Sequence, residues 1–279
     1  MMRSAAFPLL LLTLTLISAC GDEGDTNTTN VTQGVSAPAS GTLAVLTDSN
    51  AIYFVNPSDP GTLIRGMAVT NIPPTALLRS IDFRPATKEL YALDLDGGNR
   101  RLHTIDTVSG FALRIGVNSI GTTADKDFDF SPVADLMRFV DALEVNVRVN
   151  ADTLAATPDV NLTPDSDVVA VAYTNNTAGA ATTTLYGIDF VDATLVRIGG
   201  PDGTPSPNTG VVTVIGPLGV LPGINEIGFD IAPSGTAYAS WATAGGIWRL
   251  YTINLATGAA TEVGVLGNGG RVLGIAVVP

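Results

Sequence analysis

A short motif recurs along this chain at the spacing of one β-propeller blade. Three segments share an apolar residue, Asp, a second apolar residue, any residue and Pro; they are residues 81–85 (IDFRP), 128–132 (FDFSP) and 229–233 (FDIAP). Two looser copies follow the same apolar frame at residues 171–175 (VAYTN) and 275–279 (IAVVP). The second positions of the five copies are residues 82, 129, 172, 230 and 276, so the intervals are 47, 43, 58 and 46 residues. Repeats of this length are typical of propeller blades, in which each small sheet needs its neighbours to bury its faces.

The best-preserved copies are each followed by three more short strand-like stretches. After residues 81–85 these are residues 90–93, 102–110 and 112–116; after residues 229–233 they are 236–239, 250–258 and 261–267. The middle stretch of each set ends in a turn. Asp106 or Asn254 opens the turn, since an Asx side chain can bond the backbone two residues on, and a Gly closes it, since Gly accepts φ > 0. Each repeat therefore predicts a four-stranded antiparallel meander.

The third and fourth repeats are less regular. Residues 136–140 and 145–149 fit the middle strands of the third repeat. In the fourth repeat, residues 185–189 fit either the second or the third strand. We assign them to the second strand, because residues 211–219 then supply the fourth.

The two ends of the chain complete one blade. Residues 43–46, 52–56 and 62–65 read as second, third and fourth strands without a first, and the chain stops after a lone first strand at residues 273–279. Pairing the ends removes the open sheet edges. The sequence thus predicts an all-β fold, a single five-bladed β-propeller over residues 41–279 with almost no helix, closed by pairing the C-terminal strand with the N-terminal blade.

A family resemblance rests on the same repeats. Residues 171–180 (VAYTNNTAGA), 182–186 (TTTLY) and 250–260 (LYTINLATGAA) resemble the bacterial secreted family known as domain of unknown function 4394. The resemblance covers about residues 41–279 and implies a propeller-like repeat protein. It brings no catalytic residue with it.

The N-terminal segment predicts export and a lipid anchor. Residues 1–19 have a positive start and an apolar stretch too short to span a bilayer, and residues 16–20 (LISAC) resemble the lipobox of a bacterial lipoprotein signal. Cys20 is then the lipidated first residue of the mature chain, and residues 20–40 are a flexible polar tether. A soluble secretory signal with a chance cysteine is the alternative. The expected location is the extracytoplasmic cell envelope, with the choice of membrane left open.

Composition limits the partners. The formal net charge of −12 disfavours nucleic acid, which needs a basic face. A single cysteine excludes an internal disulfide, so stability must come from packing. Only 14% of residues are charged, against about 25% in an average globular protein, which indicates strands buried on both faces. The remaining partners are the membrane, through the lipid, and an unknown protein or carbohydrate.

Three aspartates are the candidate metal ligands. Asp82, Asp129 and Asp230 occupy one equivalent position in three first strands, and first strands surround the channel of a propeller. If they face the channel, they could bind a hard cation such as Ca²⁺ or act as acid and base. If they face the next blade, they accept backbone hydrogen bonds and tie blades together, which is the favoured interpretation because repeated positions usually encode the repeat.

Other candidate residues are interpreted structurally. His103, the only histidine, aligns with Tyr251 of another repeat, which indicates packing and not a catalytic role. Residues 94–99 (DLDGGN) resemble a calcium loop but lack the Gly and Glu positions of an EF-hand, so a hairpin is favoured. Trp241 and Trp248 flank a second hairpin and are expected in the core, although exposed rings there could stack on a sugar.

The sequence favours a lipid-anchored, non-catalytic binding or scaffold propeller. The alternative is a propeller hydrolase or isomerase that uses channel carboxylates with a divalent cation. An enzyme of that kind needs at least two carboxylates that converge in an open pocket, whereas a scaffold needs none.

Overall fold

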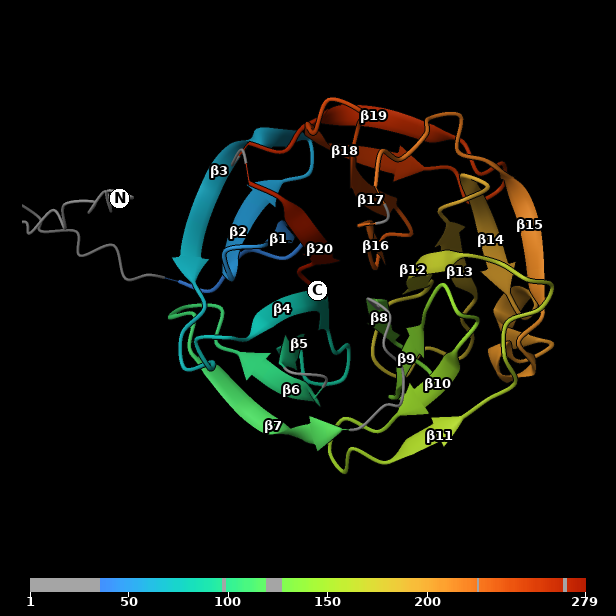
Figure 1. Ribbon diagram of the computed structural model, residues 1–279, viewed down its shortest axis with the longest axis horizontal. Helices are drawn as coiled ribbons and strands as arrows, with labels where there is room; N and C mark the ends of the chain where they lie inside the picture. Colours follow the sequence, from blue (N-terminus) through green and yellow to red (C-terminus); the bar gives the residue numbers. More distant parts are fainter. Residues whose placement is uncertain (1–35, 97–98, 119–126, 225, 268–269) are drawn as a thin grey trace, which may run out of the picture. The chain divides into compact units, whose positions relative to one another are not determined.

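Five four-stranded antiparallel sheets are arranged around a common centre in the computed structural model (Figure 1). The structure describes residues 36–279 except 97–98, 119–126, 225 and 268–269. Each sheet is one blade, and the innermost strands β20, β4, β8, β12 and β16 contact one another around the ring. The five-bladed propeller predicted from the repeat is therefore confirmed.

The blades are numbered along the chain. The first blade contains β20 (Val272–Val277), β1 (Leu43–Thr47), β2 (Ala51–Asn56) and β3 (Asp59–Ala68). The second contains β4 (Leu77–Phe83), β5 (Leu90–Asp96), β6 (Asn99–Ile105) and β7 (Ala112–Asn118). The third contains β8 (Asp127–Phe130), β9 (Met137–Val140), β10 (Asn146–Val149) and β11 (Ala156–Pro158). The fourth contains β12 (Val168–Tyr173), β13 (Leu185–Asp189), β14 (Thr194–Ile198) and β15 (Val212–Pro217). The fifth contains β16 (Gly228–Ile231), β17 (Ala237–Ala242), β18 (Trp248–Ile253) and β19 (Ala260–Val265).

Helix is nearly absent from the described residues. Two short 3₁₀ turns, η1 (Pro201–Gly203) and η2 (Pro207–Thr209), lie between β14 and β15. Within the described part of the chain, no helix has the length and apolar character needed to cross a membrane.

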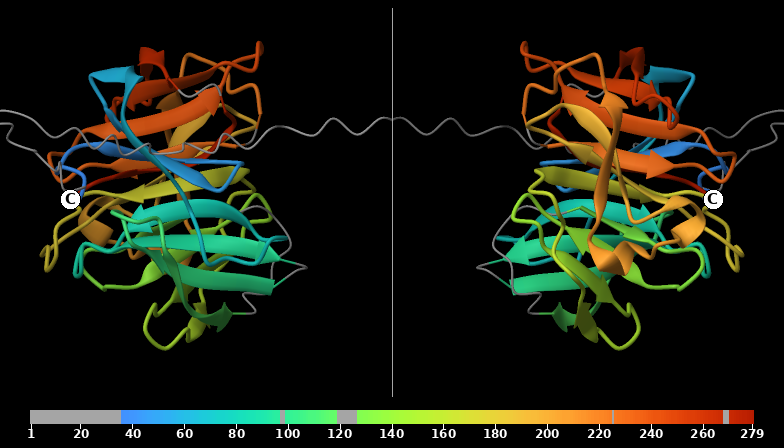
Figure 2. Two further views of the ribbon diagram at one scale, coloured as in Figure 1. Left: turned by 90° about the vertical axis from the view of Figure 1, so that its left-hand side faces the viewer. Right: turned by 90° about the vertical axis from the view of Figure 1, so that its right-hand side faces the viewer.

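The C-terminal strand closes the ring as predicted. β20 pairs antiparallel with β1, with Leu43 opposite Val277 and Val45 opposite Ile275. The backbone N–H of Gly41 donates to the carbonyl of Val278 at 2.8 Å and extends this pairing beyond the strands. The C-terminus lies near the centre of the ring in Figure 1 and at one face in the side views of Figure 2. We call this face, where the innermost strands end, the C-terminal face.

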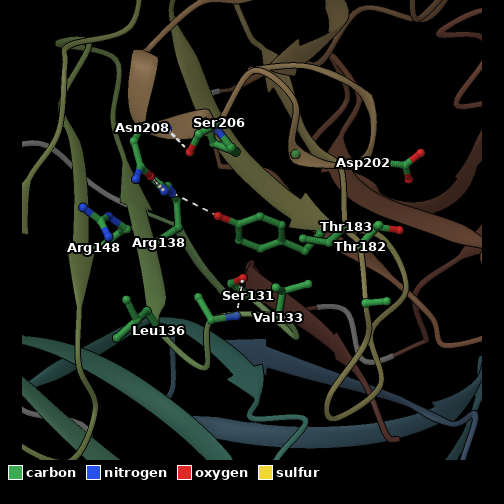
Figure 3. Close-up of a pocket in the computed structure, with 15 residues that line it drawn as sticks. Ser131, Val133, Leu136, Arg138, Arg148, Thr182, Thr183, Asp202, Ser206 and Asn208 are labelled. Carbon is green, nitrogen blue, oxygen red and sulfur yellow. Dashed lines mark hydrogen bonds between the residues drawn. The ribbon is translucent and has the colours of Figure 1, made fainter.

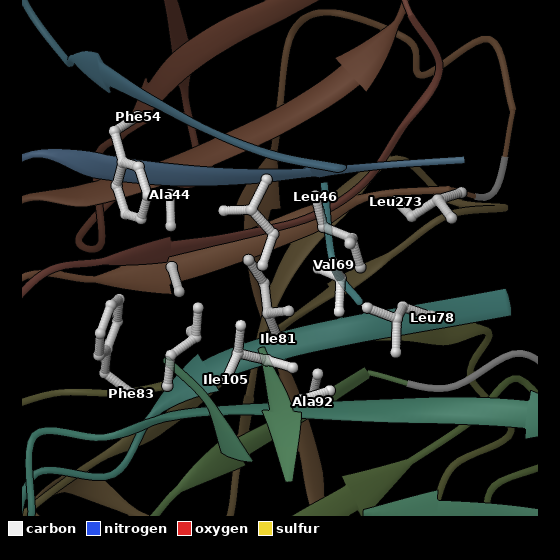
Figure 4. Close-up of a cluster of buried hydrophobic side chains, with 14 of the residues drawn as sticks. Ala44, Leu46, Phe54, Val69, Leu78, Ile81, Phe83, Ala92, Ile105 and Leu273 are labelled. Atoms are coloured by element: carbon white, nitrogen blue, oxygen red, sulfur yellow. The ribbon is translucent and has the colours of Figure 1, made fainter. Parts of the chain in front are cut away.

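The cores lie between blades because alternate residues of each strand point to opposite neighbours. In β1, Ala44 and Leu46 join a cluster shared with the second blade, whereas Leu43 and Val45 join a cluster shared with the fifth. Figure 4 shows the first of these clusters, in which Phe54 and Phe83 come from adjacent sheets. Strands buried on both faces explain the low content of charged residues.

Two strands were not assigned from the sequence. β14 supplies the third strand of the fourth blade, so the assignment of residues 185–189 to the second strand is right. β11 is three exposed residues at the outer edge of the third blade, and such a strand carries no apolar alternation.

The longest repeat carries its extra residues at the C-terminal face. The fourth blade has long connections at residues 174–184 and 199–211, where the second blade has short turns at residues 84–89 and 106–111. In a meander, the connection after the first strand and that after the third lie at the same edge. Insertions in repeat proteins map to loops on one face, often the binding face.

Candidate binding pocket and channel carboxylates

A pocket of about 230 Å³ lies between the third and fourth blades at the C-terminal face (Figure 3). Its walls include both long connections of the fourth blade and the turn after β8. The residues around it are Ser131, Val133, Ala134, Leu136, Arg138, Arg148, Tyr173, Ala181, Thr182, Thr183, Asp202, Gly203, Ser206, Pro207 and Asn208. Arg138 and Asn208 lie on one side and Thr182 and Thr183 on the other.

The two arginines of the pocket share one buried carboxylate. Arg138 Nη1 and Arg148 Nε both lie 2.8 Å from Asp159 Oδ2. The side chains of Arg138 and Asp159 are only 3% and 6% exposed. A buried charge is tolerated when it is paired and hydrogen-bonded, and this one is both.

Arg138 also connects the two blades. Its Nε donates to the phenol oxygen of Tyr173 at 3.0 Å, and its Nη2 donates to Oδ1 of Asn208 at 2.6 Å. Its Nη1 donates to Asn146 Oδ1 at 2.5 Å as well. The guanidinium is thus directed at protein acceptors and is poorly placed to recognise an anionic ligand.

Backbone hydrogen bonds hold the connection at residues 199–211 in place. Thr163 N–H donates to the carbonyl of Gly210 at 2.8 Å, and Asn146 Nδ2 donates to the carbonyl of Pro207 at 3.0 Å. Gly210 has φ +69°, and a Cβ there would lie 2.1 Å from the carbonyl oxygen of Asn161. This wall is therefore built into the fold, as expected of ligand sites, which are usually preformed.

This pocket was not predicted from the sequence. Arg138 is 35 residues from Tyr173 and 70 from Asn208 along the chain, so no local motif unites them. The signal that was present is the 58-residue interval of the fourth repeat, which is longer than the others.

The three predicted aspartates converge at the centre of the ring. Asp82, Asp129 and Asp230 each offer a carboxylate oxygen, and these three oxygens lie within 4.8 Å of one another. The residues are 2%, 1% and 1% exposed. They therefore form one buried group and not an open pocket.

Two of these carboxylates also tie neighbouring blades. Asp82 accepts the N–H of Phe83 in its own strand at 2.7 Å and that of Phe130 in the third blade at 2.9 Å. Asp230 accepts the N–H of Ile231 and that of Val277, both at 2.6 Å.

The third carboxylate is bonded less completely. Asp129 accepts a hydrogen bond from the backbone N–H of Tyr173, in the fourth blade. One amide of each innermost strand therefore reaches one of the three carboxylates. The two interpretations of the aspartates are compatible, because the side chains both converge and tie blades.

Burial dominates the ionisation of this group. It raises the pKa of Asp82 and of Asp129 well above the ordinary value, and the neighbouring carboxylates raise both further. Burial raises the pKa of Asp230 to about 6, against the lowering effect of the Val277 and Ile231 amides.

A fourth buried carboxylate lies near them. Burial raises the pKa of Asp127 to about 7, although Ser80 Oγ donates to its Oδ1 at 2.5 Å. Its other oxygen accepts the N–H of Val171 in the fourth blade at 3.2 Å.

His103 is buried inside the second blade, in agreement with the packing interpretation. Its Nε2 lies 2.8 Å from Oδ2 of Asp94, and Arg101 Nε donates to the same carboxylate at 3.0 Å. Asp94 is 0% exposed, and the facing strands β5 and β6 pair up to Asp96 and Asn99. The described residues of this segment, 94–96 and 99, thus lie in two paired antiparallel strands, as the favoured interpretation requires.

The tryptophans are also part of the core. Trp241 and Trp248 are 0% and 7% exposed. Trp241 stacks on Tyr251 with the ring centroids 4.0 Å apart. Neither ring is available to stack on a sugar.

Cys20, the signal segment 1–19 and most of the tether lie outside the described residues. The lipid anchor stays a prediction.

Solved structures share the fold at low sequence identity. A chain of the crystal structure of a nidogen/laminin complex matches with a TM-score of 0.52 and 13% identity, over 85% of this chain and 98% of that chain. A structural genomics protein of unknown function from Bacteroides thetaiotaomicron VPI-5482 matches with a TM-score of 0.51 and 15% identity. That match covers 80% of this chain and 55% of that one. Such identities support the fold alone.

Sequence comparison assigns the family. No curated protein matches. The family described as "Domain of unknown function (DUF4394)" matches residues 51–276, which include strands of all five blades. This chain therefore belongs to the DUF4394 family.

Proposed function

We propose that this protein is a lipid-anchored, non-catalytic binding module, and that the pocket between its third and fourth blades takes one neutral sugar unit of a carbohydrate. The observation that carries the proposal is the pocket itself, a preformed hollow walled by the longest loops of the ring.

The charge balance of the pocket favours a neutral ligand. Arg138 and Arg148 are matched by the paired Asp159 and by Asp202 at the rim. Because the Arg138 guanidinium is occupied by protein acceptors, an anion would have to break existing hydrogen bonds.

The chemistry of the walls favours a sugar. An apolar surface comes from Val133, Ala134 and Leu136. Hydroxyl and amide groups come from Ser131, Thr182, Ser206 and Asn208. A pyranose ring likewise presents hydroxyls at its edge and C–H groups on its faces. The volume of about 230 Å³ is below the range of about 300–1,000 Å³ typical of drug-sized ligands, which suits a single small unit.

The arrangement of acidic groups argues against the enzyme alternative. That alternative acts through carboxylates, which must be in contact with the substrate. Asp82, Asp129 and Asp230 are at most 2% exposed, and Asp159 is neutralised by two arginines.

The anchor places the module at a membrane surface. Lipidation of Cys20 would attach the mature chain to the extracytoplasmic side of a bacterial membrane. A polar segment of about twenty residues separates Cys20 from the first strand of the propeller along the sequence.

An array of immobilised neutral oligosaccharides tests the proposal. The probe is the chain from residue 20 with Cys20→Ser, which keeps every described residue but carries no lipid. Val133→Trp should fill the pocket and abolish binding, whereas Val191→Trp, at an exposed turn between β13 and β14, should leave it intact.

Three outcomes would contradict the proposal. They are no glycan bound, equal binding by Val133→Trp, and retention on a parallel peptide array in place of the glycan array. The last would indicate a protein partner.

A further inference from the structure

One oxygen at the centre of the ring has no partner. Asp129 is 1% exposed, and among the described residues its Oδ1 has no hydrogen-bond partner. Its carboxylate belongs to the group whose oxygens lie within 4.8 Å of those of Asp82 and Asp230. A buried polar atom without a partner is costly, and it points to a missing ligand.

The hydrogen bonds favour ionised carboxylates at the other two positions. Both oxygens of Asp82 accept backbone N–H groups, and so do both oxygens of Asp230. Hydrogen bonds donated to a carboxylate stabilise its charged form, whereas a protonated carboxyl would turn one of these oxygens into a donor facing a donor.

The three carboxylates therefore concentrate negative charge in a buried space. The charges that act most strongly on Asp129 are those of Asp82, Asp230 and Asp127, all of the same sign. Ionised groups buried together require a counter-charge or protonation. A cation supplies this counter-charge and leaves the amides bonded to Asp82 and Asp230 with ionised acceptors.

We propose that Asp82, Asp129 and Asp230 bind a single calcium ion on the axis of the propeller. All three donors are carboxylate oxygens, the ligands preferred by hard cations. Oxygens on opposite sides of Ca²⁺ lie about 4.6–5.2 Å apart, given Ca–O distances of about 2.3–2.6 Å, so a spread within 4.8 Å fits around the ion. Water and the second carboxylate oxygens complete the coordination.

The ion would join three blades from the inside. Asp82 belongs to the second blade, Asp129 to the third and Asp230 to the fifth. Calcium binds the closed ring and not the unfolded chain, in which the three residues are far apart, so it stabilises the native state by mass action. This role is independent of the pocket between the third and fourth blades.

Metal analysis combined with thermal melting tests the proposal on the Cys20→Ser chain from residue 20. Protein dialysed against micromolar CaCl₂ should retain about one calcium per chain after gel filtration. At a calcium concentration about a hundred times Kd, the melting midpoint should lie about 5–10 °C above that in EDTA.

Asp129→Asn is the informative variant. Asn can still accept the Tyr173 amide, and it removes one acidic group from the buried cluster, so the variant should fold and melt at or above the parent's midpoint in EDTA. It should bind no calcium, and its midpoint should not respond to the ion. The control Asp189→Asn changes a buried aspartate of the fourth blade outside the group and should keep the full response.

Two results would overturn the proposal. One is a parent protein that carries no calcium and melts at the same temperature in EDTA and in millimolar CaCl₂. Protons shared between the carboxylates would then take the place of the cation. The other is an unchanged calcium response in Asp129→Asn, which would place the ion elsewhere.

Discussion

Asp230 accepts a hydrogen bond from the backbone N–H of Val277 at 2.6 Å, so one carboxylate joins the fifth blade to the strand that closes the ring. Its other oxygen accepts the N–H of Ile231 in its own strand. The repeated aspartate thus acts at the point where the two ends of the chain meet.

Removing this tie should destabilise the ring. Asp230→Ala leaves two buried amides without an acceptor, and each such amide costs about 1–3 kcal/mol. Asp230→Asn keeps an acceptor and should cost less. Urea unfolding in EDTA measures both, with the exposed Asp192→Ala as control. Equal stability of Asp230→Ala and the control would mean that the tie has no structural role.

Deleting residues 273–279 should be far more harmful than shortening the tether. The deletion removes most of β20, and with it the partners of four β1 residues and the backbone hydrogen bonds of Val278 to Gly41 and Thr42. At about 1 kcal/mol for each lost ladder bond, the melting midpoint should fall by about 10–20 °C. Deletion of seven tether residues, 24–30, is the matched control. An unchanged cooperative melt after the C-terminal deletion would show that the ends do not depend on each other.

The calcium-free protein should lose stability as the pH rises from about 4 to about 7. Burial raises the folded-state pKa of Asp230 to about 6 and that of Asp127 to about 7, whereas an unfolded Asp titrates near 3.9. The folded state therefore binds more protons in this window, and the stabilisation present below pH 4 is lost as the pH passes these values.

Urea midpoints in EDTA at pH 5 and pH 7.5 measure this effect. The lowered pKa of Asp152, beside Arg84, acts in the opposite direction, but below about pH 4 and outside the window. Asp127→Asn should flatten the dependence. A parent protein that becomes more stable between pH 5 and pH 7.5 would refute the raised pKa values of these carboxylates.

Cys20→Ser should release the protein from membranes. The lipobox and the polar segment after it predict that Cys20 carries the acyl chains, and two or more chains are needed for stable attachment. Detergent-phase partitioning and incorporation of labelled palmitate measure this in the producing bacterium. Equal partitioning and labelling of parent and variant would exclude lipidation at this residue.

The fold could be predicted from the sequence because every blade carries a copy of the repeat. The Asp of the motif recurs in the innermost strands of three blades, so its position predicted the ring and identified Asp82, Asp129 and Asp230 as one group. Whether these side chains converge stayed open, because the motif does not say which way they point. The other two innermost strands, β12 and β20, lack this Asp, so the pattern does not predict their part in the central group. Ala172 and Ala276 occupy the same position, and the amides that follow them reach Asp129 and Asp230 in the preceding blades.

The pocket could not be predicted in the same way. Arg138, Tyr173 and Asn208 come from different blades and have no periodic relation, so their contact arises only when the ring has closed. The strand that contains Arg138 was predicted, but nothing in its pattern indicates that the arginine is buried and bonded to the next blade. Non-local polar networks of this kind leave no local pattern in a single sequence.

The most direct test of binding at this pocket is an NMR titration of the ¹⁵N-labelled Cys20→Ser chain with the glycan selected on the array. Chemical-shift changes should centre on the amides of Ser131, Thr183 and Asn208, they should vanish in Val133→Trp, and the glycan should be recovered unchanged. Shifts centred on the opposite face, around Asp141 and Asp189, or cleavage of the glycan by the parent protein, would contradict a non-catalytic binding site between the third and fourth blades.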